Sequence, residues 1–384
     1  MKTVRLVPIL FIVSIGFACH NKTHREENKE ITFIYIDSLS NENIIIQNKD
    51  KHRFLKLETT ENCLVAKVEK MEFDEDKMFI RDSNQKIFVF DKNGKFLNTI
   101  GQIGQGPDEL YCIFNFYLDK KNKRICVTDV LKSVLFSYSY NGDLLEKKMV
   151  NRDIFKDFSQ LFLVEKNTLL LKRDNFPGSN YNFSLVSGNN YDNVDNCIPY
   201  LFIGEKDQGE GCLIVAQSGN ETYISALISD TIYRYDAKTK HIVPDMVFKG
   251  KYRPMTKRDV EGKRLGIALD ALLTAREKKL SYGISDLVMT KKYLNFVSQN
   301  PSSVDRMIWN RETKKGYTFK TFDSESMLTN FFSYVIAATD DAFVCAIPAE
   351  QLIHANWEEN ESAQKAAENT LEDDNPIIAF YYFE

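Results

Sequence analysis

The chain has 384 residues, a formal net charge of −4, 43% hydrophobic residues and 12% aromatic residues. This length accommodates several domains or one large repetitive domain, with enough apolar side chains for a substantial core. The slightly negative charge gives no reason to expect nucleic acid or an anionic membrane face as a partner. Abundant Phe and Tyr with few Pro are typical of strands rather than of disorder.

Residues 1–18 have the pattern of a lipoprotein signal peptide. Lys2 and Arg5 form a basic start, and residues 6–17 form an apolar run too short for a comfortable membrane span. Small residues then precede Cys19, as in a bacterial lipobox, which predicts cleavage before Cys19 and lipid attachment to it. Ordinary secretory cleavage near Ala18 is the alternative. The absence of Asp directly after Cys19 suggests an outer-membrane lipoprotein, on the periplasmic or the surface side.

Residues 19–30 are polar without periodicity and are expected to form a flexible tether before a folded part at 31–384. His20 and His24 are four residues apart there, but in a charged tail we interpret them as solvated side chains. Six cysteines remain after Cys19, so disulfides are allowed outside the cytoplasm. Several lie in apolar strand patterns, and we expect mostly free thiols. No CxxC or HExxH motif is present, and we expect no metal and no cofactor.

The stretch from Phe79 to Asp119 sets the pattern for the whole chain. Short runs rich in aromatic and β-branched residues, such as Ile87 to Phe90, predict strands. Asn93-Gly94 supplies the positive φ of a two-residue hairpin turn before the returning strand. The stretch therefore predicts one antiparallel sheet of three or four strands.

Paired strand patterns of this kind recur along the chain, which indicates repeated structural units. Five further copies follow the first, at residues 125–129 with 134–138, 168–174 with 181–186, 223–230 with 231–236, 293–298 with 306–310, and 342–347 with 377–383. Their spacing is close to the roughly 40–50 residues of propeller blades. Because thin sheets must bury both faces against neighbours, we predict an all-β fold, a six-bladed β-propeller. A β-sandwich is the alternative.

Two segments interrupt the repeats with helical patterns. Residues from about 256 to 285 carry leucines at helical spacing among basic residues, which predicts a helical insertion between blades 4 and 5. It is either a lid on one face or, because it is basic, a docking element for an anionic partner or lipid surface. A second helical piece is expected at residues 361–371. Ring closure needs an N-terminal strand, either residues 31–36 or 54–57, beside the C-terminal run.

A glycine-rich crossing joins the first unit to the second and is expected to run across the blade toward the central mouth. We interpret it either as a tight structural crossing, with Glu109 accepting from loop amides, or as a ligand contact. A phosphate loop is not expected, because the following residues are strand-like rather than helical. The candidate ligand or loop residues here are Gly101, Gly104, Gln105, Gly106, Pro107, Asp108, Glu109 and Tyr111, together with Arg81 on the preceding blade.

The run FDKNGKFLNTIGQIGQGPDEL, with FLKLETTENCLVAKVEKMEFDEDKMFIRD before it, resembles the 6-bladed β-propeller lipoproteins of Bacteroides and its relatives, distant kin of NHL-repeat propellers. The ending DNPIIAFYYFE is similar to the closing strand of that family. The likeness covers essentially all of the mature chain, and Leu110-Tyr111 departs from it, since the family often has an aromatic residue directly after Glu. The resemblance implies a fold and an envelope location. It supplies no reaction, so no catalytic residue is carried over.

Few residues point to chemistry. Asp82, Asp129 and Asp230 recur at equivalent points, which favours a structural role as acceptors of amide hydrogen bonds. Arg81 and Tyr111, with Tyr117, either serve a sugar ligand or pack. No GxSxG elbow is present.

The leading hypothesis is a lipid-anchored cell-envelope binding or scaffold protein, with a site at the propeller mouth and no catalysis assigned. Its expected partners are a carbohydrate or an envelope protein, and the membrane is reached through the lipid only. A monomer is expected. The alternative is an envelope glycan-active lyase or hydrolase at the central mouth, and a third reading is a metal-dependent lactonase-like propeller. Paired carboxylates or a bound cation at the axis would favour catalysis.

Overall fold

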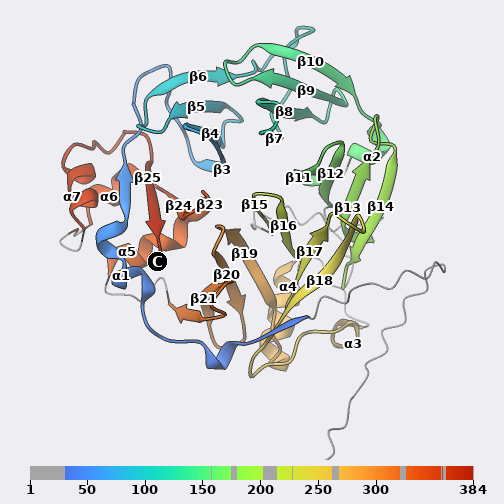
Figure 1. Cartoon of the computed structure of the whole chain (residues 1–384), viewed down its shortest axis with the longest axis vertical. Coiled ribbons are helices and arrows are strands. Elements are labelled where there is room, and N and C mark those ends of the chain that lie inside the picture. Colours follow the sequence, from blue (N-terminus) through green and yellow to red (C-terminus); the bar gives the residue numbers. More distant parts are fainter. Residues whose placement is uncertain are drawn as a thin grey trace, which may run out of the picture. The chain divides into compact units, whose positions relative to one another are not determined.

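The computed structural model describes residues 31–156, 158–173, 180–201, 214–226, 228–261, 268–320, 326–355, 357 and 360–383. The predicted signal peptide, Cys19 and the tether lie outside these residues. Six sheets are arranged in a ring, so the prediction of a six-bladed β-propeller is confirmed (Figure 1). In each blade the strand nearest the axis is the first of the blade's consecutive strands, and a strand added from the N-terminal part of the chain lies at the rim (Figure 1).

Blades 1 to 3 each contain four consecutive strands of the chain. Blade 1 has β3 (Val68–Asp74), β4 (Lys77–Asp82), β5 (Ile87–Asp91) and β6 (Phe96–Ile100). Blade 2 has β7 (Asn115–Asp119), β8 (Arg124–Asp129), β9 (Val134–Ser139) and β10 (Leu144–Met149). Blade 3 has β11 (Phe158–Glu165), β12 (Thr168–Arg173), β13 (Tyr181–Ser187) and β14 (Asn193–Pro199). The repeats found in the sequence are the second and third strands of each blade.

Blades 4 and 6 each take a strand from the N-terminal part of the described chain. Blade 4 has β15 (Val215–Ser218), β16 (Glu221–Ser225), β17 (Thr231–Asp236), β18 (His241–Lys249) and the added β1 (Thr32–Tyr35). Blade 5 has β19 (Gly283–Met289), β20 (Tyr293–Gln299), β21 (Val304–Asn310) and β22 (Gly316–Phe319). Blade 6 has β23 (Val335–Ala338), β24 (Ala342–Ile347), β25 (Ile377–Tyr382) and β2 (Arg53–Leu55).

The ring closes through β2, one of the two predicted closing segments. Arg53 to Leu55 pair antiparallel with Phe380 to Ile378 of β25. The other candidate, residues 31–36, is wrong as a closing strand, because β1 pairs parallel with β18 at the rim of blade 4. The last blade is therefore built from both ends of the folded chain, which removes the open outer edge that β25 would otherwise expose.

The core lies between neighbouring blades, and alternation along a strand decides which interface each side chain joins. In β4, Met78 and Ile80 pack with Phe380 against blade 6, whereas Phe79 packs with Phe116 against blade 2. Equivalent clusters join blades 2 and 3, 3 and 4, 4 and 5, and 5 and 6. Each blade is thus buried on both faces, which a single thin sheet could not achieve alone.

Turns are present at the Asn-Gly pairs of blades 1 and 2, but the prediction of a two-residue turn is wrong. The N–H of Asp91 donates to the carbonyl of Lys95, which leaves a three-residue loop in which the glycine alone has a positive φ. Gly94, between β5 and β6, has φ +82°, and Gly142, between β9 and β10, has φ +93°. A Cβ at Gly94 would lie 2.3 Å from the carbonyl oxygen of Lys56, so this turn requires glycine for space as well as for its dihedral angle.

Helices occupy the connections. The insertion between blades 4 and 5 holds α3 (Lys257–Val260) and α4 (Ala268–Lys278), which pack through a small cluster that includes Ala271, Ala275 and Met255. The predicted helix near 361–371 is α7 (Glu361–Glu368). The remaining helical segments are η1 (Ile36–Ser38), α1 (Ile44–Gln47), η2 (Lys49–Lys51), α2 (Arg152–Phe155), α5 (Met327–Phe331), η3 (Phe332–Tyr334) and α6 (Ala349–Ile353).

The five cysteines within the described residues are all free, as expected: Cys63, Cys112, Cys126, Cys197 and Cys345. In the same part of the chain, no helix has the length and apolar character needed to cross a bilayer.

Candidate functional site

A cavity of about 1950 Å³ occupies the axis of the propeller. It is lined by residues of the innermost strands of all six blades, β3, β7, β11, β15, β19 and β23. In β3, β19 and β23 consecutive residues belong to this lining, for example Lys70 to Asp74. The cavity is therefore a direct product of the ring and is assembled from segments far apart in the sequence.

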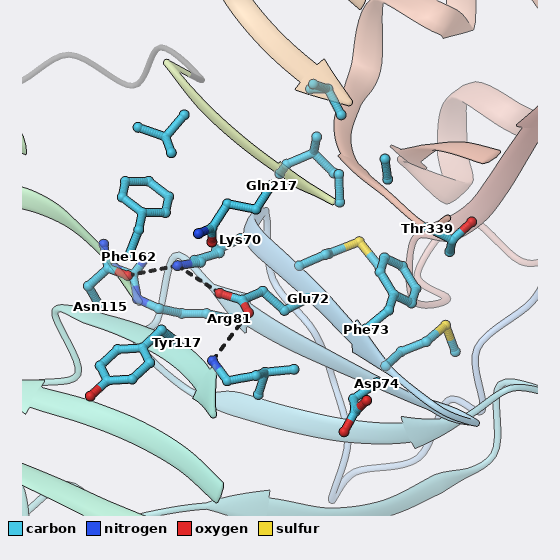
Figure 2. A pocket seen from close by; sticks show the side chains of 18 of the residues that line it. Lys70, Glu72, Phe73, Asp74, Arg81, Asn115, Tyr117, Phe162, Gln217 and Thr339 are labelled. Carbon is cyan, nitrogen blue, oxygen red and sulfur yellow. Dashed lines mark hydrogen bonds and ion pairs between the residues drawn. The ribbon is translucent and has the colours of Figure 1, made fainter. Parts of the chain in front are cut away.

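Lys70 of β3 is the most heavily engaged polar side chain of the wall (Figure 2). Its Nζ lies 3.0 Å from Glu72 Oε1 and donates to the side-chain oxygen of Asn115 at 3.1 Å and to the carbonyl of Phe116 at 2.5 Å. The ammonium also lies 5.0 Å and 5.1 Å from the ring centres of Phe116 and Phe162. Blades 1, 2 and 3 thus meet around one cation.

Two carboxylates beside Lys70 are also paired. Glu72 Oε2 accepts from the backbone N–H of Leu118 at 3.2 Å, and Glu69 lies 2.7 Å from Arg81. Arg81 in turn donates from Nε to the carbonyl of Ile113 at 3.0 Å. The side chain of Glu69 is 39% exposed against 22% for Glu72, so Glu69 offers more of its surface to the cavity.

Further groups around the cavity combine hydrogen-bonding and apolar surface. Gln217 of β15 lies in the cavity wall (Figure 2). Its side-chain amide donates to the carbonyl of Leu163 at 2.8 Å. Among the described residues, the buried hydroxyls of Ser159 and Ser218, which belong to residues of the lining, have no hydrogen-bond partner. Buried polar atoms of this kind are uncommon in native structures and indicate a missing partner such as water or a ligand.

The side of the cavity formed by blades 5 and 6 contains two apolar stretches, Leu287 to Met289 of β19 and Val335 to Ala338 of β23. It also carries carboxylates, those of Asp286, Asp340 and Asp341. Phe73 and Phe162 add half-buried aromatic rings on the side of blades 1 and 3. The cavity therefore combines charged and amide groups with aliphatic and aromatic surface.

The glycine-rich crossing lies against blade 2, and none of residues 101–111 is part of the cavity lining. Glu109 Oε2 accepts from the N–H of Gly106 at 2.7 Å, as the structural interpretation expects. A Cβ at Gly104 would lie 2.1 Å from the same oxygen. Lys132 donates to the carbonyls of Gly106 and Glu109, and Lys147 lies 2.6 Å from Asp108.

The other crossing residues are placed as follows. Gly101 has φ +71°, and Gln105 and Pro107 are exposed. Tyr111 is 47% exposed, with Lys132 Nζ 4.5 Å from its ring centre. A ligand contact by this loop stays a prediction, because the structure brings only Arg81 of the predicted site residues to the cavity.

The remaining polar residues singled out in the sequence have structural partners. Asp82 accepts from the N–H groups of Ala66 and Lys86, and Asp129 accepts from Tyr111 and Lys132, so each ties its turn to the segment before the innermost strand. Asp230 differs, since its carboxylate accepts from the Ser281 hydroxyl at 2.7 Å, and burial raises its pKa to about 6.

Tyr117 lines the cavity but is almost fully buried in the interface of blades 2 and 3, where burial raises the pKa of its hydroxyl well above the usual value. Among the described residues, no group of three or more His, Cys, Asp or Glu is placed to hold a metal ion.

Sequence reasoning did not select Lys70, Glu72, Asn115, Phe162 or Gln217. The signal that could have found them is the innermost strand that precedes each recognised repeat, where polar residues interrupt an otherwise buried pattern, as in VEKMEFD of β3.

Six blades around a lined axial cavity define this protein as a six-bladed β-propeller. The chain belongs to the family described as domain of unknown function DUF4934, which matches residues 37–382. No curated protein is significantly similar to it.

Two solved structures are similar to the chain over most of its length. One is named "putative exported protein" of Bacteroides fragilis, with 18% identity and a TM-score of 0.73, covering 92% of this chain and all of that one. The other is a member of the DUF4221 family from Bacteroides vulgatus, with 13% identity and a TM-score of 0.49, covering 88% of this chain and 97% of that one. At such identities, the first likeness supports the fold alone.

Proposed function

We propose that the protein is an exported binding protein that holds a carbohydrate in its axial cavity. The observation that carries this proposal is the pair of buried, unpartnered hydroxyls, Ser159 and Ser218, beside a wall of charged, amide and aromatic groups. Sugars present hydroxyls along their edges and apolar C–H faces, so they suit a cavity with hydrogen-bonding groups and half-buried rings such as Phe162.

The size of the cavity favours an extended ligand. Pockets for drug-sized molecules are roughly 300–1,000 Å³, whereas this cavity measures about 1950 Å³. An oligosaccharide of a few units fills such a space better than a single sugar.

At the wall around Lys70, binding is favoured over catalysis because both glutamates there, Glu69 and Glu72, are paired with cations. A glycosidase needs two carboxyl groups that are available to the bond they cleave. Glu69 and Glu72 each already have a cation within 3.0 Å, Arg81 and Lys70 respectively.

Export is supported by the signal-peptide pattern of residues 1–18 and by the name of the similar Bacteroides fragilis protein. Lipid attachment at Cys19 and sorting to the outer membrane belong to the same proposal. Metabolic labelling with a fatty acid is expected to mark the protein, and a Cys19→Ala variant is expected to lose the label. Labelling that persists in that variant would remove the lipoprotein assignment.

The binding proposal is tested by titrating neutral and acidic oligosaccharides into the purified protein by calorimetry. We expect Ser159→Ala to leave stability unchanged, because its hydroxyl has no partner to lose, and Gln217→Ala to remove a cavity amide. Each is expected to weaken binding by about tenfold, the effect of one net hydrogen bond of roughly 1–1.5 kcal/mol.

Gln47→Ala, on the exposed surface of α1, is the matched control and is expected to bind as the unaltered protein does. The proposal fails if no oligosaccharide binds, or if the two cavity variants bind as tightly as the control.

A further inference from the structure

The added strand β1 presents an apolar row to solvent. Ile31, Phe33 and Tyr35 are 38%, 50% and 59% exposed, whereas Ile34 between them is buried against blade 5. The strand is held by its parallel pairing with β18 at the rim of blade 4. The backbone of β1 is therefore fixed in the sheet, and the exposed side chains of this row are not covered by another strand of the sheet.

A basic stretch borders this row. Residues 249–258, KGKYRPMTKR, contain five cationic residues and no acidic one, in a chain whose net charge is −4. Lys249 lies beside Tyr35 in the strand pairing, and its Nζ is 4.7 Å from the ring centre of Phe33. Lys251 Nζ is 5.7 Å from the ring centre of Tyr252. Cations and aromatic rings are thus interleaved on one surface.

Most of this charge has no ion-pair partner among the residues that the structure describes. Arg253 is paired with Asp259 at 2.6 Å, but Lys249, Lys251, Lys257 and Arg258 are exposed. The exposed acidic residues on the flanking segments are Asp37, after β1, and Glu261, after α3. The surface keeps an excess of positive charge.

We infer that Ile31, Phe33, Tyr35, Lys249 and Lys251, here called the basic aromatic face, dock on an anionic phospholipid bilayer. Tyr and other aromatic residues favour the headgroup level of membranes, and lysines beside them are attracted to anionic lipid. An acidic polysaccharide or peptide would match the lysines but leave the apolar row in water. An anionic bilayer interface matches the charge of the lysines and also covers the apolar row.

Docking through this face is independent of the ligand in the axial cavity. It would add to the proposed lipid at Cys19, from which the 12 residues to Ile31 span at most about 40 Å when fully extended. A lipid chain and a basic surface together give a more stable attachment than one signal alone.

The test is co-sedimentation with vesicles, using residues 20–384, which lack the proposed lipid site and contain every described strand and helix. We expect binding to vesicles of phosphatidylethanolamine and phosphatidylglycerol, weakening as salt is raised, and little binding to phosphatidylcholine vesicles. A Lys249→Gln/Lys251→Gln variant is expected to bind about 25-fold more weakly, from a factor of roughly five for each cation near an anionic surface.

A Phe33→Ser/Tyr35→Ser variant is expected to lose binding while retaining its thermal transition, since both side chains are exposed. The matched controls are Leu131→Ser/Met149→Ser, which are 69% and 70% exposed on blade 2, and Lys314→Gln/Lys315→Gln, exposed on blade 5. The inference is overturned if the unaltered protein does not bind anionic vesicles, or if the control variants lose as much binding as the variants of the basic aromatic face. It is also overturned if the protein binds acidic polysaccharides but no vesicles.

Discussion

Acidification should destabilise the propeller through His52, which stands directly before the closing strand β2. Its ring is 2% exposed and lies 4.6 Å from the ring of Tyr381 and 6.0 Å from that of Phe383. Nε2 is 2.9 Å from the carbonyl oxygen of Ile45, and Nδ1 has no partner among the described residues. Burial lowers the pKa of His52 from 6.5 to about 4, so the folded protein holds the ring neutral.

The magnitude follows from that shift. The unfolded chain takes up a proton below pH 6.5, whereas the folded chain does so only near pH 4, so stability is full above pH 6.5 and falls between these values. Each pKa unit corresponds to about 1.36 kcal/mol. The free energy of unfolding is therefore expected to fall by about 2 kcal/mol at pH 5, and by about 3.4 kcal/mol at pH values well below 4.

The assay is urea unfolding of the unaltered protein and of His52→Gln, at pH 7.5 and pH 5.0. Because other titrating groups are shared, the difference between the two proteins isolates His52. We expect the stability advantage of the unaltered protein to shrink by about 2 kcal/mol on going to pH 5.0. An advantage that is equal at both pH values would refute the reasoning.

Two further predictions concern Asp230 and Gly94. Burial raises the pKa of Asp230 from 3.8 to about 6, so its contribution to stability is greatest below pH 3.8 and is lost as the pH rises through 6. Asp230→Asn keeps an acceptor for Ser281 and should unfold at higher urea than the unaltered protein at pH 7.5, by up to about 3 kcal/mol. That gain should shrink at pH 4.5, and a gain that grows on acidification would contradict the assignment. Gly94→Ala should cost about 3 kcal/mol or more, because strain at φ +82° is joined by a Cβ 2.3 Å from a backbone oxygen. Gly219→Ala, with φ +57° and no heavy atom within 4 Å of the new Cβ, should cost only about 1 kcal/mol, and equal losses in thermal unfolding would show that space is not the cause.

The strands, turns and helical insertion were predictable because their signals are local. Ile87 to Phe90 carries its β-propensity in four adjacent residues, and Asn93-Gly94 specifies a turn whatever surrounds it. Repetition then predicted six blades, since the same short pattern returned at blade-length intervals. The amides that Asp82 and Asp129 accept from were likewise expected from their recurrence.

The strand that closes the ring could not be predicted from local sequence signals. Residues 31–36 and 54–57 both read as strands, and the longer, more apolar run was not the one chosen. Phe54 is held by partners about 300 residues away, since its N–H donates to Ser362 and its ring packs on Trp357. Such long-range contacts leave no local mark in the sequence.

The amino-acid pattern alone was therefore enough to establish repeated sheets, their number and the place of the helical insertion, because backbone preference and side-chain alternation act between near neighbours. The axial cavity depended on the closed ring. Lys70, Phe162 and Gln217 come from three different blades, and each reads as an ordinary inner-strand residue until six sheets turn those strands toward one axis. Residues become a site only when they share a space, and that space is created by packing between distant blades.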